Sequence, residues 1–219
     1  SSERMLFKQE IPRNAFMKRM RRSGRLELLA LALMITVGCN GQKHDEQLPG
    51  AGEDAQASVS LEKPPTDEQK SKMIAAKDVL FARLSGRLME VMGSEGPVAA
   101  IAVCKSEASE IAKAVGQQED VKIGRTALKL RNPNNQPPAW AESLVAAAVD
   151  QPTFLTLSDG RGAALLPIKL KGLCLMCHGP VDQIMPEIKS QLATHYPNDQ
   201  ATGFKEGDLR GWFWVETTE

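Results

Sequence analysis

The change in residue character at Cys39 decides which part of this chain can form a hydrophobic core. The uncharged stretch 28–38 ends directly before Cys39, and a basic cluster precedes the stretch. A basic region, a short apolar stretch and a small residue before a cleavage point are typical of an export signal. The stretch is too short to remain as a membrane-spanning helix, which needs about 20 residues. The basic cluster consists of Lys18, Arg19, Arg21, Arg22 and Arg25.

Gly38 and Cys39 resemble the end of a bacterial lipobox, in which the cysteine receives lipid and becomes the first residue of the mature protein. Thr36 stands where such a motif usually has leucine, so an ordinary signal peptide with an incidental cysteine is the alternative. Export would place the protein on the periplasmic side of a bacterial membrane. For a lipoprotein Asn40 favours the outer membrane, and without lipid the protein would be soluble in the periplasm.

Residues 40–65 are polar and rich in Gly, Pro, Ser and Gln. Such a segment cannot bury enough apolar surface to offset the entropy of ordering it. We therefore expect a signal peptide with an upstream extension over 1–38, a lipid-anchored flexible tether over 39–65 and a folded domain over 66–219. The whole chain carries 27 basic and 27 acidic residues, and this neutrality argues against a nucleic-acid partner.

Two helices are expected at the start of the folded domain. Thr66 and Gln69 match a capping box, and apolar residues recur at helical spacing from there to about residue 92. Pro97 then suits the start of a second helix. On that helix five residues spaced three or four apart share one face, which places Cys104 toward the core. The five are Ile101, Cys104, Ala108, Ile111 and Val115.

Strands alternate with shorter helices after residue 120, which predicts an α+β fold with a small antiparallel sheet. The turn-forming residues Ser158, Asp159 and Gly160 separate two apolar runs and predict a β-hairpin. The expected elements are a strand over 121–130, a helix over 137–149, hairpin strands over 153–157 and 162–170, a helix within 181–196 whose start Pro186 limits, and a last strand over 209–216.

The motif with the clearest chemical meaning is Cys174-Leu175-Met176-Cys177-His178, which has the form C-x-x-C-H. In this motif the two thiols add to the vinyl groups of a haem, and the adjacent histidine becomes the proximal ligand of the iron. Covalent attachment of haem occurs outside the cytoplasm, the compartment that the export signal also indicates. The sequence therefore predicts one covalently bound haem c.

Two other interpretations of the motif are weaker. A zinc site needs a second pair of ligands, and no other C-x-x-C occurs in the chain. A thioredoxin-like motif should follow a strand inside a βαβ unit, and the sequence does not predict one there.

The second axial ligand of the iron is not decided by spacing. Met185 lies seven residues after His178, which is too close to reach the opposite face of the haem. His195 and Cys104 are both candidates. His195 could instead be a polar residue that closes a helix, and Cys104 could instead be a small buried side chain without a metal.

The chain resembles the Tll-type haem c family, long catalogued as a domain of unknown function. The resemblance implies a PAS-like antiparallel sheet with flanking helices and a long N-terminal helix. It also implies that His178 and a cysteine on an upstream helix hold the iron, and by position that cysteine is Cys104. The anchor and tether over 39–65 lie outside the family pattern. The matching segments are 100–112, 124–137, 174–179 and 196–215, in family order.

A haem with both axial positions filled by the protein predicts an electron carrier, because no position stays open for a substrate. We expect no enzyme activity, since a peroxidase needs an open position with acid–base groups. The alternative is a haem-based redox or gas sensor that signals through a separate partner. The expected partners are thus a redox or signalling protein and, through the lipid anchor, the membrane.

We predict that Cys39→Ala releases the protein from the membrane, because lipid on this cysteine would be its anchor. Fractionation of a bacterial host that exports the full chain should find the variant with the soluble periplasmic proteins and the parent chain with the membranes. A variant that stays in the membrane fraction would place the anchor elsewhere.

Overall fold

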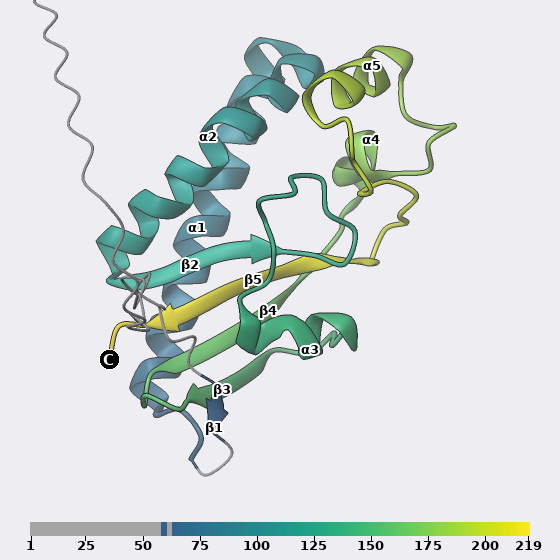
Figure 1. Ribbon diagram of the computed structural model, residues 1–219. Coiled ribbons are helices and arrows are strands. Elements are labelled where there is room, and N and C mark those ends of the chain that lie inside the picture. The colour runs from purple at the N-terminus through teal and green to yellow at the C-terminus, as the bar shows by residue number, and fades with distance from the viewer. Residues whose placement is uncertain (1–57, 61–62) are drawn as a thin grey trace, which may run out of the picture. The chain divides into compact units, whose positions relative to one another are not determined.

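A five-stranded antiparallel sheet forms the centre of the fold, with helices on both faces (Figure 1). The computed structural model describes residues 58–60 and 63–219, which belong to a compact unit spanning Gly50–Glu219. The predicted export signal and Cys39 lie outside the described residues. Among the described residues no helix is long and apolar enough to cross a membrane.

Each pair of neighbours in the sheet order β1-β3-β4-β5-β2 runs antiparallel, which confirms the predicted α+β class. The strand β1 (Val59–Ser60) lies inside the stretch 39–65, which the sequence predicts to be a flexible tether. The strands are β1 (Val59–Ser60), β2 (Val121–Thr126), β3 (Thr153–Leu157), β4 (Gly162–Lys169) and β5 (Leu209–Thr217). The helices are α1 (Asp67–Ser94), α2 (Gly96–Glu119), η1 (Ala139–Ala141), α3 (Glu142–Ala146), η2 (Gly172–Cys174), α4 (Leu175–His178) and α5 (Pro186–His195).

The helix α1 begins at a capping box. The Thr66 hydroxyl accepts a hydrogen bond from the Gln69 amide at 3.1 Å, and the Gln69 side chain accepts one from the Thr66 amide at 3.0 Å. Two backbone donors that the first helical turn cannot use are thereby satisfied. Glu95 then joins α1 to α2, and Pro97 lies in the first turn of α2 as expected.

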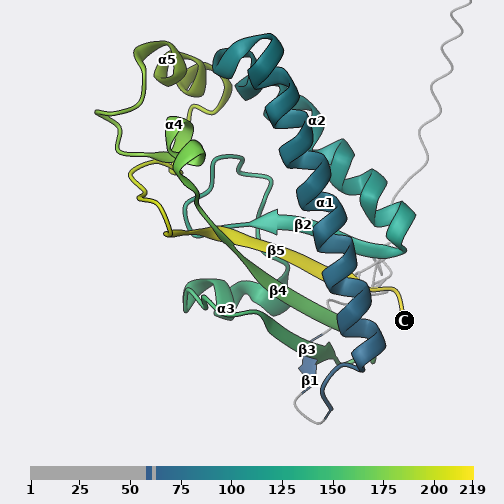
Figure 2. The same cartoon turned by 180° about the vertical axis from the view of Figure 1, so that it is seen from behind.

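Residue alternation in the strands separates two hydrophobic clusters on opposite faces of the sheet. On one face the helices α1 and α2 pack against Ala164, Leu166 and Val215. On the other face α3 packs against Leu165 and Trp212. Figure 2 shows α1 in front of the sheet and α3 behind it.

Two predicted elements are shorter than expected. The strand predicted over 121–130 ends at Thr126, because the following segment leaves the sheet and the carbonyl of Leu130 accepts a hydrogen bond from the Gln200 amide instead. The helix predicted over 137–149 is reduced to η1 and α3. It ends early because Ala148 takes a left-handed conformation with φ 51°.

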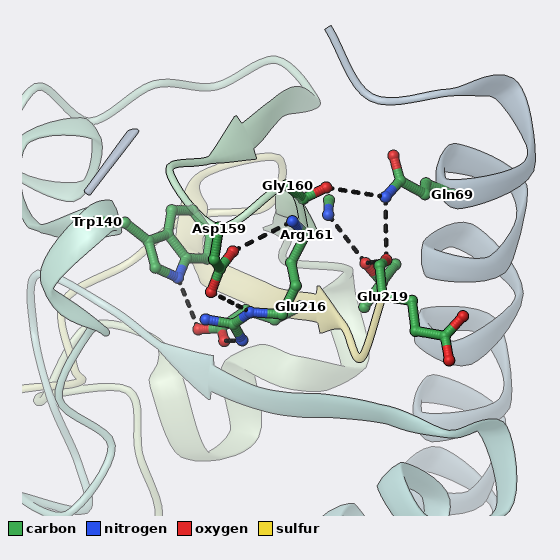
Figure 3. A network of polar contacts seen from close by, with 9 residues as sticks. Gln69, Trp140, Asp159, Gly160, Arg161, Glu216 and Glu219 are labelled. Atoms are coloured by element: carbon green, nitrogen blue, oxygen red, sulfur yellow. Dashed lines mark hydrogen bonds and ion pairs between the residues drawn. The ribbon is translucent and has the colours of Figure 1, made fainter. Parts of the chain in front are cut away.

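A buried carboxylate ties the hairpin turn to the last strand (Figure 3). Glu216 accepts hydrogen bonds from the Trp140 indole at 2.8 Å and from the Arg161 guanidinium at 2.6 Å. The side-chain amide of Gln69 donates to the carbonyl of Gly160 in the same turn at 3.3 Å. The network joins the hairpin turn, β5 and the first turn of α1.

We predict that Arg161→Gln lowers the free energy of unfolding by about 2 kcal/mol, because it leaves the buried Glu216 carboxylate with one neutral donor. Urea unfolding followed by circular dichroism measures the change. Lys169→Gln is the matched control, since Lys169 forms an exposed ion pair with Asp150 and should cost less than about 0.5 kcal/mol. Equal losses in the two variants would contradict the assigned role of Glu216.

Candidate functional site

The C-x-x-C-H motif forms a single short helical turn. Cys174 ends η2, and α4 contains Cys177 and His178. The two cysteines are half-buried, and neither forms a disulfide. Cys174 packs against the small cluster of Leu170, Ala201 and Phe204, whereas Cys177 packs against a second cluster that contains Ile101 of α2. The turn therefore presents two free thiols beside an imidazole.

The imidazole of His178 is held in one orientation. Its Nδ1 lies 2.7 Å from the carbonyl oxygen of Ala201. Because a carbonyl can only accept, Nδ1 carries the hydrogen and Nε2 keeps its lone pair. The ring also lies edge-on to the Phe204 ring, with centroids 6.4 Å apart. Nε2 is thus the nitrogen available to a metal, and the carbonyl supports it as second-layer partners of ligating histidines commonly do.

The surroundings of His178 keep the imidazole neutral. Burial, together with the positive charges of Arg131 and Arg210, lowers the pKa of His178 to about 3. Neutral imidazole is the form that ligates metals, because a protonated ring has no free lone pair.

The loop that follows α5 forms hydrogen bonds to the motif turn. The Phe204 amide donates to the carbonyl of His178 at 3.0 Å, and the Gly203 amide donates to the carbonyl of Gly179 at 2.8 Å. The same loop supplies the Ala201 carbonyl that orients the imidazole. These bonds fix the motif turn relative to the loop at three places.

Arg131 connects this loop to the motif. Its Nε donates to Asp199 at 3.0 Å, and its Nη2 donates to the carbonyls of Cys177 at 2.6 Å and Ala201 at 3.2 Å. The side chains of Arg131 and Asp199 are only 13% and 10% exposed. One buried ion pair therefore positions both the backbone of the second motif cysteine and the acceptor for His178.

Sequence reasoning did not assign a role to Arg131 or Asp199. Both lie in segments that carry the family resemblance, 124–137 and 196–215, but nothing in their spacing pairs them. One signal could have indicated Arg131: it is a charged residue directly before the turn-forming residues Asn132 and Pro133, where a turn does not require a charge.

Cys104 does not point into the core, so that prediction is wrong. The apolar face of α2 divides between two clusters: Val115 packs against the sheet, and Ile101 packs against α5. Cys104 lies between them, and its side chain is exposed. The single stripe on α2 could not reveal this division, because both halves of the stripe look equally apolar in sequence.

Cys104 is nevertheless close to the motif. Cys177 packs against the cluster that contains Ile101, one helical turn before Cys104 on α2. Protein atoms around Cys104 raise the pKa of its own thiol, and the positive charges of Arg125 and Arg131 oppose that rise. The structure thus brings Cys104, Cys177 and two arginines into one region, although they are far apart in sequence.

Neither of the other two candidate ligands is buried. Met185 precedes α5 and is 51% exposed. His195 ends α5 and lines a surface pocket of about 350 Å³ together with Lys105, Arg131 and Tyr196. None of Cys104, Cys174, Cys177 and His178 is among the residues that line this pocket.

The alternatives to haem attachment find no support in the described part of the chain. There, no group of three or more His, Cys, Asp or Glu side chains is placed to hold a metal by itself, as a zinc site would require. The strands β4 and β5 on either side of the motif are antiparallel, whereas a thioredoxin-like site belongs to a βαβ unit.

Fold and site together define an α+β domain in which a C-x-x-C-H turn packs between α2 and the loop after α5. The model of the Tll0287-like family matches residues 39–217, and the chain belongs to that family. The match begins at Cys39, so the expectation that the stretch 39–65 lies outside the family pattern is wrong.

A solved structure has the same fold. The crystal structure of the cyanobacterial heme-protein Tll0287 superposes with a TM-score of 0.51 and 24% sequence identity. The similarity covers 68% of this chain and 94% of that protein. The comparison with curated proteins found no match.

Proposed function

We propose that this chain is an exported c-type cytochrome that holds one haem covalently and carries electrons. The observation that carries the proposal is the motif turn, which presents two free thiols beside a neutral imidazole whose Nε2 is available. Membership of the Tll0287-like family and the similarity to a protein described as a heme-protein support it.

The residues present fit a haem. Cys174 and Cys177 would each add across a vinyl double bond, the sulfur bonding to one carbon and the thiol hydrogen passing to the other, so that no oxidant is needed. His178 would ligate the iron through Nε2, and Ala201 and Arg131 would hold His178 and the motif backbone in place. Cys104 is proposed as the second axial ligand, as a thiolate. When bound, the haem supplies one-electron redox chemistry.

Two protein ligands on the iron favour electron transfer over catalysis. With His178 and Cys104 both bound, no coordination position remains for a substrate, so we propose that the chain is not an enzyme. The partner would be another redox protein. Lipid on Cys39 would keep the domain at the periplasmic face of a bacterial membrane, within reach of such partners. We also propose that the fold is PAS-like, as the family resemblance implies.

Covalent attachment is the first prediction of this proposal. The full chain, expressed with a periplasmic haem-attachment system, should keep its haem after denaturation, because thioether bonds survive unfolding. Intact mass and haem-dependent peroxidase staining of the denatured band measure this. The double variant Cys174→Ala/Cys177→Ala should lose the stain. A stain-free parent chain without added mass would contradict haem c binding.

The second prediction concerns Cys104. Cys104→Ala should leave the haem attached but convert the ferric spectrum from low spin toward high spin or toward a new ligand. The reduction potential should rise, because a thiolate favours ferric iron. His195→Ala is the control and should leave the spectrum unchanged. If His195→Ala changes the spectrum and Cys104→Ala does not, His195 is the ligand.

A sensor is the second candidate function. The exposure of Cys104 supports it, because a small molecule could reach this ligand and replace it. The helix α2 packs on the sheet at one end and on α5 at the other, so loss of the Cys104 bond could move one end relative to the other. Carbon monoxide added to the reduced protein separates the roles: no binding favours the carrier, and ready displacement of Cys104 favours the sensor.

A further inference from the structure

Arg125 is a half-buried cation without a counter-charge. It lies on β2, and it shares the face of Val121 and Ile123, which pack beneath the helices α1 and α2. Its guanidinium forms no hydrogen bond or ion pair with any residue in 58–60 or 63–219. A charge withdrawn from water needs a partner, because burial of an unpaired charge is costly.

The neighbours of Arg125 do not supply a negative charge. Cys104 and Tyr196 are the two groups that act on it electrostatically. Neither side chain is a carboxylate, the usual partner of a guanidinium.

A second arginine nearby is in a similar state. Arg210 donates to the carbonyl of Lys129 at 3.1 Å and lies over the Phe204 ring, with its guanidinium carbon 5.8 Å from the centroid. No carboxylate among the described residues pairs with it. Burial together with the charges of Arg131 and Arg125 lowers the pKa of Arg210 to about 10. The carboxylate of Asp199 is already paired with Arg131.

Two positive charges thus remain unbalanced beside the motif. Figure 1 shows that β2 ends and β5 begins on the side of the sheet nearest α4. Arg210 stacks on the same Phe204 ring that lies edge-on to His178, and Arg125 neighbours Cys104. The two cations therefore border the region between the proposed axial ligands.

We propose that Arg125, together with Arg210, binds the propionate groups of the haem. The inference rests on the proposed function, because the ligand is the haem itself. Ferric haem with its two propionates and a thiolate ligand carries a net charge of two negative units, which these two arginines would balance. A guanidinium also matches a carboxylate geometrically, because its N–H groups can form two parallel hydrogen bonds to the two oxygens.

The test compares three variants of the full holoprotein. Arg125→Gln removes the charge, and Arg125→Lys keeps the charge but loses the paired geometry. Arg83→Gln is the control, because Arg83 is exposed on α1 and its one hydrogen-bond partner among the described residues is Gln118. Intact mass first establishes that each chain carries covalent haem. Redox-difference infrared spectra of protein grown with ¹³C-labelled aminolevulinate then identify the propionate carboxylate bands.

Both Arg125 variants should shift the labelled propionate bands. Arg125→Gln should also lower the reduction potential, because a lost positive charge disfavours addition of an electron, while Arg125→Lys should retain most of the potential. Arg83→Gln should change neither the propionate bands nor the reduction potential.

Unchanged propionate bands in a haem-loaded Arg125→Gln protein would overturn the inference. A lowered potential with unchanged bands would assign Arg125 to the Cys104 thiolate instead. If Arg125→Gln does not fold, the bands of Arg125→Lys decide in the same way. A parent chain without haem would instead overturn the proposed function.

Discussion

The buried ion pair between Arg131 and Asp199 is the interaction on which the candidate site depends. Among the described residues, Arg131 is the one side chain that bonds both to the backbone of Cys177 and to the carbonyl that orients His178. Losing one partner of such a pair leaves a buried charge uncompensated, at a cost of about 3–5 kcal/mol. A short turn such as α4 has too few internal hydrogen bonds to hold its own orientation. The hydrogen bonds from Arg131 to the backbone hold it instead.

The second constraint comes from α2. Its apolar face serves two clusters, one over the sheet and one under α5, and Cys104 occupies the position between them. A helix anchored at both ends places the thiol with little freedom, although the side chain itself stays exposed. This combination of a fixed backbone and an accessible sulfur suits an axial ligand. Both proposed functions, carrier and sensor, rest on this residue for that reason.

Much of the fold could be predicted from the sequence because its signals are local. The capping box at Thr66, the hairpin turn at Ser158–Gly160 and the proline at the start of α5 each act within a few residues. The C-x-x-C-H motif is local in the same sense. The early end of β2 was not predictable, because Leu130 bonds to Gln200 from a distant segment. The partners of Arg131 and the exposure of Cys104 likewise depend on contacts between segments far apart in sequence, which no spacing within one segment records.

The arginines show how charge and topology combine. Arg125 lies near the end of β2 and Arg210 near the start of β5, and only the pairing of these strands brings both to the same end of the sheet. Neither position is unusual in the sequence taken alone. Because neither has a carboxylate partner among the described residues, the surroundings of the motif favour a ligand that brings its own negative charges.

The central proposal is that His178 and Cys104 would both ligate the iron of one haem. X-ray absorption at the iron K-edge of the ferric holoprotein tests it most directly, because the nearest shell distinguishes sulfur from nitrogen. The account predicts one sulfur ligand besides the porphyrin nitrogens and one imidazole nitrogen. A shell made of nitrogen alone would contradict it.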